Sequence, residues 1–259
     1  MKLNIVPART GITWVKLGIR TFLKQPLALA GLFFMYMTAV IAVAQIPVAG
    51  VIIGGLLVPA ATLGLMAATE EATKGRFPMP WVLLSAFRAG RQRVRAMLVL
   101  GVIYTAGSLA ASSLASALVG GGKEAAENAL DVATLLALVL HTPLFMMFWH
   151  APALVHWHGV TPAKSLFFSL VACLRNFGAF GLYGIGWIGV FLVVGTVFGL
   201  LGGLLGGQSM ARGVMMPVAL LMAAMFSTSI YFTFRDCFVA TPHEPDGPDE
   251  ASDRSEETA

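Results

Sequence analysis

Charged residues are scarce in this chain of 259 residues: Asp, Glu, Lys and Arg make up 12% of it, whereas hydrophobic residues make up 57%. Soluble domains carry about 25% charged and about 45–50% apolar residues. A chain with so little charge lacks the polar side chains needed to cover a globule of this size. This excludes a cytosolic enzyme, a nucleic-acid-binding domain and a disordered chain, and it predicts a polytopic membrane protein.

Several other features are missing. The chain has only two cysteines, Cys173 and Cys237, both expected on the cytoplasmic side, where thiols stay reduced. It contains no nucleophile elbow, no phosphate-binding loop, no HExxH motif and no cluster of acids. We therefore expect no enzyme activity and no cofactor. No Asp, Glu, Lys or Arg lies in the middle of a predicted span, which argues against proton-coupled antiport and voltage sensing.

Long apolar runs are the dominant feature that is present. Crossing a bilayer takes roughly 20 mostly apolar residues. The runs predict an all-α transmembrane bundle of about six spans, at 27–44, 48–68, 96–118, 132–152, 178–205 and 213–234. The glycine-rich stretch 199–207 is a weak boundary, so the last two spans are merged or shifted in an alternative count of five or seven.

The basic residues predict the orientation. With the N-terminus in the cytoplasm, all of the 17 Lys and Arg residues except Lys123 and Arg212 fall on the cytoplasmic side. This is the bias expected of inner-membrane proteins. We expect a multi-pass protein of the bacterial inner membrane, N-in/C-in, with a bundle over 27–240. Residues 241–259, which hold seven of the 13 acidic residues, are expected to form a disordered cytoplasmic tail.

Three cytoplasmic segments place basic residues on one side of a helix and apolar residues on the other: residues 1–26 and the segments near 80–95 and 161–176. Each segment has a proline suited to a first helical turn, namely Pro7, Pro80 and Pro162. The basic residues are Arg9, Lys16, Arg20, Lys24, Arg88, Arg91, Arg95, Lys164 and Arg175. The opposite stripes are Gly11, Trp14, Val15, Gly18 and Phe22; Leu83, Phe87, Gly90 and Val94; and Leu166, Leu170, Cys173, Leu174 and Phe177.

Two interpretations of these basic helices are open. As interfacial helices they would lie in the membrane surface and attract anionic lipids. As connectors they would pack under the bundle with their Lys and Arg side chains extended to water. Their recurrence predicts three units of one interfacial helix and one transmembrane hairpin, a repeat found in transporters and in inert scaffolds alike.

Few polar residues inside the spans are candidates for function. His141 lies near the middle of the fourth span, two residues before Pro143, and is a hinge or ligand candidate. The alternative is a neutral imidazole bonded to a carbonyl that Pro143 frees. His150, His156 and His158 follow, interleaved with Trp residues, and are either metal or haem ligands or ordinary membrane-belt residues. The helical spacing does not put these histidines on one side, so no metal is expected.

A second candidate is a polar cluster at the cytoplasmic end of the bundle, formed by Arg175, Asn176, Arg235 and Asp236. Arg235 and Asp236 are expected to pair with each other or with Arg175.

Three stretches resemble a family of uncharacterised proteobacterial inner-membrane proteins. Residues 8–26 carry a Trp-x-x-x-Gly, basic, Gln-Pro segment that leads into the first span. Residues 149–155, with the sequence WHAPALV, resemble the central signature of that family, and residues 231–238, YFTFRDCF, resemble its final motif. The chain is similar in layout to YciC-like proteins. The resemblance implies a six-span inner-membrane protein and supplies no catalytic residues.

These observations support three hypotheses. The first is a non-enzymatic accessory, assembly or lipid-interacting envelope protein, which contacts anionic lipids, a membrane-protein partner or a second copy through its basic helices. The second is a transporter or channel for a neutral or lipidic substrate, with Pro59, His141 and Pro143 marking helix breaks near a central site. The third is a redox subunit with His ligands.

Overall fold

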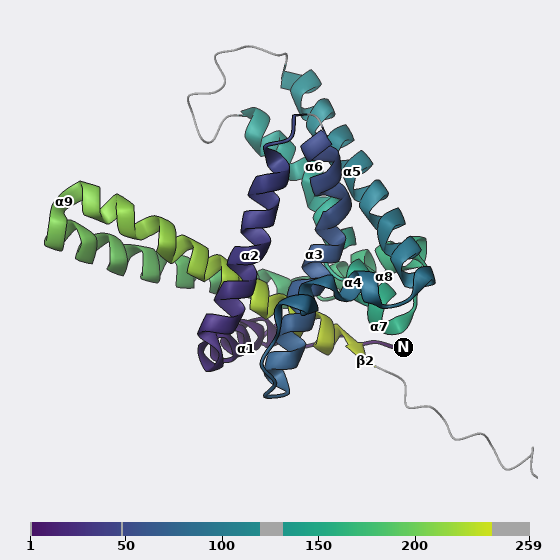
Figure 1. The fold of residues 1–259 in the computed structure, drawn as a ribbon, viewed down its shortest axis with the longest axis horizontal. Coiled ribbons are helices and arrows are strands. Elements are labelled where there is room, and N and C mark those ends of the chain that lie inside the picture. The colour runs from purple at the N-terminus through teal and green to yellow at the C-terminus, as the bar shows by residue number, and fades with distance from the viewer. Residues whose placement is uncertain (1, 48, 120–131, 240–259) are drawn as a thin grey trace, which may run out of the picture.

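The computed structural model describes residues 2–47, 49–119 and 132–239 (Figure 1). The predicted tail at 241–259 and the loop at 120–131 lie outside these residues. The elements are β1 (Lys2–Leu3), α1 (Thr10–Lys24), α2 (Pro26–Ala44), α3 (Ala49–Thr73), the 3-10 helix η1 (Pro80–Leu84), α4 (Ser85–Arg88), α5 (Arg91–Val119), α6 (Val132–Phe148), α7 (Ala151–His158), α8 (Pro162–Arg175), α9 (Phe177–Cys237) and β2 (Phe238–Val239).

Among the described residues, five helical segments are long and apolar enough to cross a membrane: α2, α3, α5, the stretch Thr134–His158 that spans α6 and α7, and α9. The predicted all-α polytopic bundle is therefore confirmed. The last helix, of 61 residues, loses helical geometry at Gly206 and Gly207. There it folds into a hairpin with two antiparallel arms (Figure 1). The arms cover the two last predicted spans, and the reversal falls in the glycine-rich stretch where the sequence left their boundary weak.

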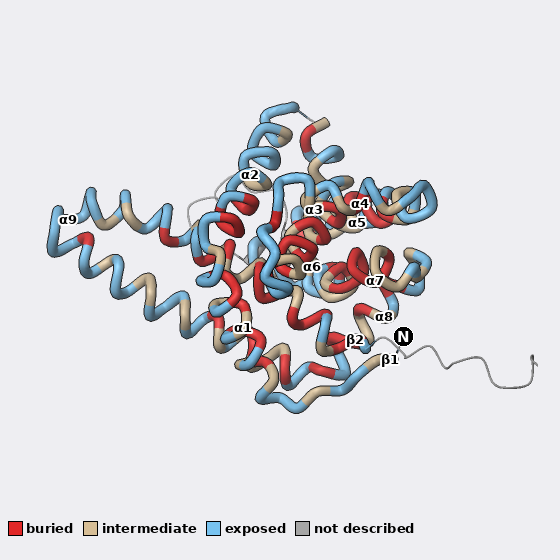
Figure 2. Tube along the Cα trace, turned by 60° about the horizontal axis from the view of Figure 1, so that its bottom comes forward, coloured by how far each residue is buried: buried red, intermediate tan, exposed pale blue. Residues whose placement is uncertain are grey.

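The α9 hairpin extends away from the other long helices, and most of its surface is exposed (Figure 2). Near its tip, Leu204 is 83% and Leu205 is 76% exposed. Continuous apolar surface of this extent faces lipid or another protein rather than water. The exposed arms therefore agree with a membrane location for α9.

Helix α1 packs tightly across the root of this hairpin. A Cβ atom at Gly11 would collide with the carbonyl oxygen of Ala179 on the first arm, and one at Gly18 would collide with the side chain of Ser229 on the second arm. Small residues allow such a close approach of helices. The buried side of α1 contains all five residues of its predicted apolar stripe, together with Thr21. This side contacts α9, which is the connector arrangement rather than burial in lipid.

The segment near 80–95 differs from the single amphipathic helix that the sequence predicts. The 3-10 helix η1 begins at Pro80 as expected, but α4 is only four residues long and α5 starts at Arg91. Between them Gly90 has a φ of 94°, a conformation that ends a right-handed helix. The predicted stripe of Leu83, Phe87, Gly90 and Val94 is therefore broken, and Phe87 is 40% exposed.

Helix α8 begins at Pro162 as predicted, but its buried side is rotated. Of the predicted stripe, Leu166 and Cys173 are buried, whereas Leu174 and Phe177 are 55% and 71% exposed. The buried side contains Ser169, whose Oγ donates to the carbonyl of Met146 at 2.7 Å and accepts from the backbone N–H of His150 at 3.0 Å. This small polar side chain satisfies backbone groups at the α6–α7 junction, so the buried side of α8 is centred nearer to Ser169 than the predicted stripe is.

A strand pair that the sequence does not predict joins the two ends of the described chain. β1 and β2 pair antiparallel, with Lys2 opposite Val239 and Leu3 opposite Phe238. The backbone N–H of Asn4 adds a bond to the carbonyl of Cys237 at 2.8 Å. The segment before α1 is thereby attached to the end of α9, and α1 itself begins at Thr10 rather than at Pro7.

Candidate functional site

The shorter elements and the helix ends gather at one end of the molecule, which we call the base. It comprises α1, η1, α4, α7, α8, the strand pair, the start of α5 and both ends of α9 (Figure 1). All nine predicted basic side chains lie on the base or directly beside its helices, and all nine are exposed. Within the described ranges none of them forms an ion pair. The base therefore presents free positive charge to its surroundings.

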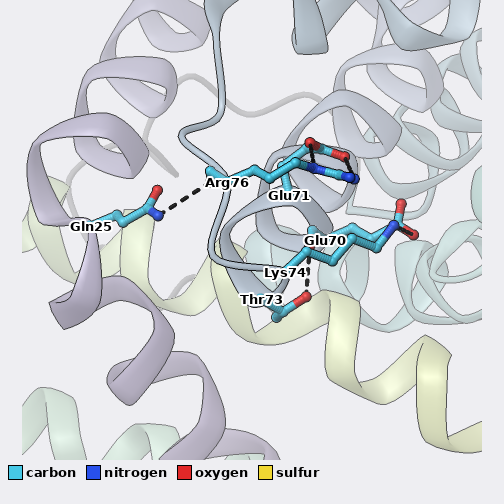
Figure 3. A network of polar contacts seen from close by, with 6 residues as sticks. All are labelled: Gln25, Glu70, Glu71, Thr73, Lys74 and Arg76. Carbon is cyan, nitrogen blue, oxygen red and sulfur yellow. Dashed lines mark hydrogen bonds and ion pairs between the residues drawn. The ribbon is translucent and has the colours of Figure 1, made fainter.

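The acidic residues of the described part of the chain do not offset this charge. The described part of the chain has three carboxylates, Glu70, Glu71 and Asp236, and each is already paired. Figure 3 shows two of these pairs at the end of α3: Lys74 Nζ lies 2.6 Å from Glu70 Oε1, and Arg76 Nε lies 2.5 Å from Glu71 Oε2. The three described carboxylates thus form ion pairs with neighbouring cations. None of them pairs with the nine predicted basic residues.

The same network fixes the loop that follows α3. The side-chain amide of Gln25, at the α1–α2 junction, donates to the carbonyl of Arg76 at 3.2 Å (Figure 3). Thr73 donates to the carbonyl of Glu70 at 2.6 Å. The Gln25 bond attaches the loop after α3 to the α1–α2 junction, whereas the Thr73 bond is local to the end of α3, so both have a structural role.

The predicted polar cluster of Arg175, Asn176, Arg235 and Asp236 is only partly brought together. Arg235 Nε donates to Asp236 Oδ1 at 2.8 Å, as one of the two expected pairings, whereas Arg175 takes part in no ion pair of the described chain. The other carboxylate oxygen, Oδ2, accepts from the indole N–H of Trp14 at 2.9 Å. Both oxygens of Asp236 are thus bonded to groups other than Arg175.

Asn176 is buried and fastens the N-terminal segment. Its Oδ1 accepts from the backbone N–H of Val6 at 2.8 Å, and its Nδ2 lies 3.2 Å from the carbonyl of Asn4 and 3.0 Å from that of Ala172. All of its hydrogen-bonding groups are used inside the protein. Asn176 is therefore a structural residue rather than a ligand-binding one.

His141 bridges two helices inside the membrane region. Its Nδ1 lies 2.8 Å from the carbonyl of Ala137 and its Nε2 lies 3.4 Å from Ser108 Oγ on α5. Because a carbonyl only accepts, Nδ1 carries the proton and Nε2 accepts from the Ser108 hydroxyl. The carbonyl that His141 binds belongs to Ala137, one turn earlier in the helix. It is not the carbonyl of Val139, which lacks a helical donor because Pro143 has no N–H. Neither His141 nor Pro143 lines the two cavities described below.

The three histidines near α7 do not form one site. His150 is fully buried, and its Nε2 lies 3.2 Å from Thr233 Oγ1, which also accepts from the indole of Trp149 at 3.0 Å. Among the described residues, no group of three or more His, Cys, Asp or Glu is placed to hold a metal ion. His150 is a core residue that joins the α6–α7 junction to α9.

Sequence reasoning missed two residues of the base. Like its neighbours Arg91 and Arg95, Arg93 is exposed and forms no ion pair with a described residue, but helical periodicity puts it on a different side of a helix from them. Trp81 is 54% exposed on η1. A sequence signal for Trp81 exists, since Trp is enriched at membrane interfaces.

Comparison with known proteins adds one relative. The chain is similar to a probable inner membrane protein of Burkholderia thailandensis, with 40% identity over 274 residues that cover 98% of this chain and 100% of the relative. No protein-family model and no solved structure matches the chain.

Proposed function

This chain belongs to the same family as the Burkholderia thailandensis inner membrane protein, and from that premise we propose that its base binds anionic phospholipid headgroups. In this proposal it is a non-enzymatic accessory or assembly protein of the bacterial envelope. Both termini face the cytoplasm, so that the base meets the inner leaflet. The integral membrane character rests on the five apolar helical segments and on the relative.

One observation carries the proposal: nine exposed cations of the base have no acidic partner among the described residues, while the three described carboxylates are paired elsewhere. A Lys or Arg near an anionic leaflet gains about 1 kcal/mol. Several such residues on one surface therefore give a strong preference for anionic over zwitterionic lipid. Since α1 buries its apolar side against α9, the contact is electrostatic and does not depend on inserting α1 into the bilayer.

The test is charge reversal on the base. A variant with Arg88→Glu, Arg91→Glu and Arg95→Glu is expected to lose the enrichment of phosphatidylglycerol over phosphatidylcholine around the protein. The measurement is the composition of lipids that remain with the full chain after reconstitution in mixed nanodiscs. Arg212→Glu, near the far tip of α9, is the control and is expected to keep the enrichment.

A second triple reversal, at Lys16, Arg20 and Lys24, tests the same surface on α1. Both triple variants should lower the enrichment, because the surface charge acts collectively. Equal enrichment in the wild type and in both triple variants contradicts the proposal. Recovery of a stoichiometric protein partner in place of anionic lipid would favour the assembly role through a protein contact.

Transport of a lipidic substrate is a second candidate, favoured by one observation. An apolar cavity of about 550 Å³ lies between α2, α3 and η1, and several of its lining residues are exposed, including Met35 and Val40. In vesicles that contain the purified protein, transport predicts faster movement of a fluorescent phospholipid between leaflets than in empty vesicles. An unchanged rate argues against it.

A further inference from the structure

An apolar groove runs between α2 and α3 and is closed at the base by η1 and α4. Its volume is about 550 Å³, within the range of about 300–1,000 Å³ of small-molecule sites. It is lined by Met35, Tyr36, Ala39, Val40 and Val43 of α2, by Gly54, Leu57, Val58, Ala60 and Ala61 of α3, and by Pro80, Trp81, Leu83, Leu84 and Phe87. None of the described residues in its lining is charged.

A second cavity, of about 330 Å³, lies next to the groove on the base. Its lining contains the guanidinium-bearing residues Arg88 and Arg93, together with Trp81, Ser85 and His156. Neither arginine forms an ion pair with a described residue, and Nδ1 of His156 is buried and has no hydrogen-bond partner within the part of the chain described. The cavity therefore offers two free cations and one unused polar atom.

Trp81 lines both cavities, so that the apolar groove and the basic cavity meet at its side chain. We propose that the two cavities together bind one glycerophospholipid, with an acyl chain in the groove and the phosphate between Arg88 and Arg93. This inference rests on the proposed function and names one specific site within it. The indole of Trp81 lies at the boundary between chain and headgroup, the level that Trp prefers in membranes.

The chemistry of the two cavities selects this occupant. The groove is formed by two of the membrane-spanning helices and is apolar, so a hydrocarbon chain matches it and a water-soluble anion does not. Guanidinium groups bind phosphate oxygens through paired, charge-assisted hydrogen bonds. Because the described lining of neither cavity contains a carboxylate, the phosphate meets no competing negative charge from these residues.

Gly54 provides a direct way to fill the groove. Gly54 lines the groove, and a Cβ atom added there would have no protein atom within 4 Å, so a side chain can be introduced at this position without an immediate collision. Gly31 on α2 is a matched control, because a Cβ there also meets nothing within 4 Å and Gly31 does not line the groove. Both substitutions replace glycine inside a helix, which favours helix formation.

The experiment is a titration of the full-length protein, in mild detergent, with phosphatidylglycerol, followed by native mass spectrometry. The wild type is expected to bind one lipid more tightly than any others. Gly54→Leu and the pair Arg88→Gln with Arg93→Gln are each expected to weaken this first event by about tenfold or more, the loss expected for a filled groove or for missing charge-assisted bonds. Gly31→Leu and Arg212→Gln should bind like the wild type.

Two results would overturn the site. In one, Gly54→Leu binds phosphatidylglycerol like the wild type while its melting temperature shows that it is folded. In the other, glycerol 3-phosphate, which has the phosphate and no chains, competes as well as the lipid does. If Gly54→Leu proves unfolded, the arginine pair decides the outcome.

The charge-reversal variant of α1 distinguishes a failure of this lipid site from a failure of the proposed function. If Gly54→Leu and the arginine pair keep the first lipid while reversal of Lys16, Arg20 and Lys24 still lowers anionic enrichment, the base binds lipid without this site. If neither measurement changes, both proposals fail.

Discussion

The indole of Trp14 is fully buried, and its N–H donates to Asp236 Oδ2 at 2.9 Å. A buried donor without a partner costs about 1–3 kcal/mol, so this bond fixes both the side chain and the helix that carries it. Arg235 binds the other oxygen of the same carboxylate. These hydrogen bonds hold α1 against the end of α9. The nine predicted cations of the base take no part in them.

Cys173 allows a test of burial on α8. Burial raises the pKa of its thiol from the usual 9.0 to about 12. The folded protein therefore keeps this thiol protonated, and we expect iodoacetamide at pH 8 to modify Cys173 only after denaturation in SDS. Mass spectrometry of the alkylated peptide measures this. A cysteine at the exposed position of Lys164, on the same helix, is the control and should react in the folded protein.

The same thiol predicts a pH dependence of stability. The unfolded thiol ionises near pH 9.0 and the folded one near 12, so the folded state binds more protons between these values. The stabilising contribution is complete below pH 9 and declines as the pH rises toward 12.

In the alkylation experiment, modification of Cys173 in the native protein at the rate of the exposed control would contradict the burial.

At the scale of the element, the reversal of α9 depends on one glycine. Gly207 has φ 70° and ψ −164°, a combination that only glycine adopts readily. A Cβ atom at Gly207 would meet no protein atom within 4 Å, so any cost of a substitution there comes from the backbone alone. The hairpin is therefore encoded by conformational freedom rather than by packing at its tip.

Gly207→Ala is expected to destabilise the protein by about 1–3 kcal/mol, because alanine is strained in this conformation. The measurement is thermal unfolding of the full chain in a lipid-like detergent. Gly203→Ala is the matched control, since it lies in the same helix with open space around it and without a positive φ. It should unfold at the wild-type temperature or above. Equal melting temperatures for both variants would show that the hairpin does not need the glycine.

At the scale of the whole molecule, the unpaired positive charge of the described chain is concentrated at the base. The free cations lie at the base, and the strand pair brings both ends of the described chain to that same end. Arg212 follows the reversal of α9 at Gly206 and Gly207, and the hairpin extends away from the base (Figure 1). Such an arrangement is what the positive-inside rule leads us to expect if the base faces the cytoplasm, as proposed.

The proposed N-in/C-in topology is tested by cysteine labelling of spheroplasts. A membrane-impermeant maleimide is expected to label a cysteine at position 212 from outside and to label one at position 16 only after lysis. Both positions are exposed, and the native Cys173 and Cys237 are buried, so the background should be low. Labelling of position 16 in intact spheroplasts would reverse the orientation.

Local composition and periodicity determine much of this protein. Apolar runs identify the chain as a membrane protein and determine the positions of its long helices. The reason is that exposing backbone polar groups or charges to lipid is costly regardless of which residues pack nearby. The buried stripe of α1 was also predictable, since a helix repeats every 3.6 residues. The exposed position of the nine cations follows from the cost of burying a charge.

Only the tertiary structure decides which distant groups meet. Trp14 and Asp236 are 222 positions apart, and no local pattern indicates that they pair. The break at Gly90 replaces the predicted second amphipathic helix, and the contact of α8 with the α6–α7 junction selects Ser169 over Leu174. The groove and the basic cavity share Trp81 because α2, α3, η1 and α7 pack together there. Contacts of this kind depend on long-range packing, which local sequence does not encode.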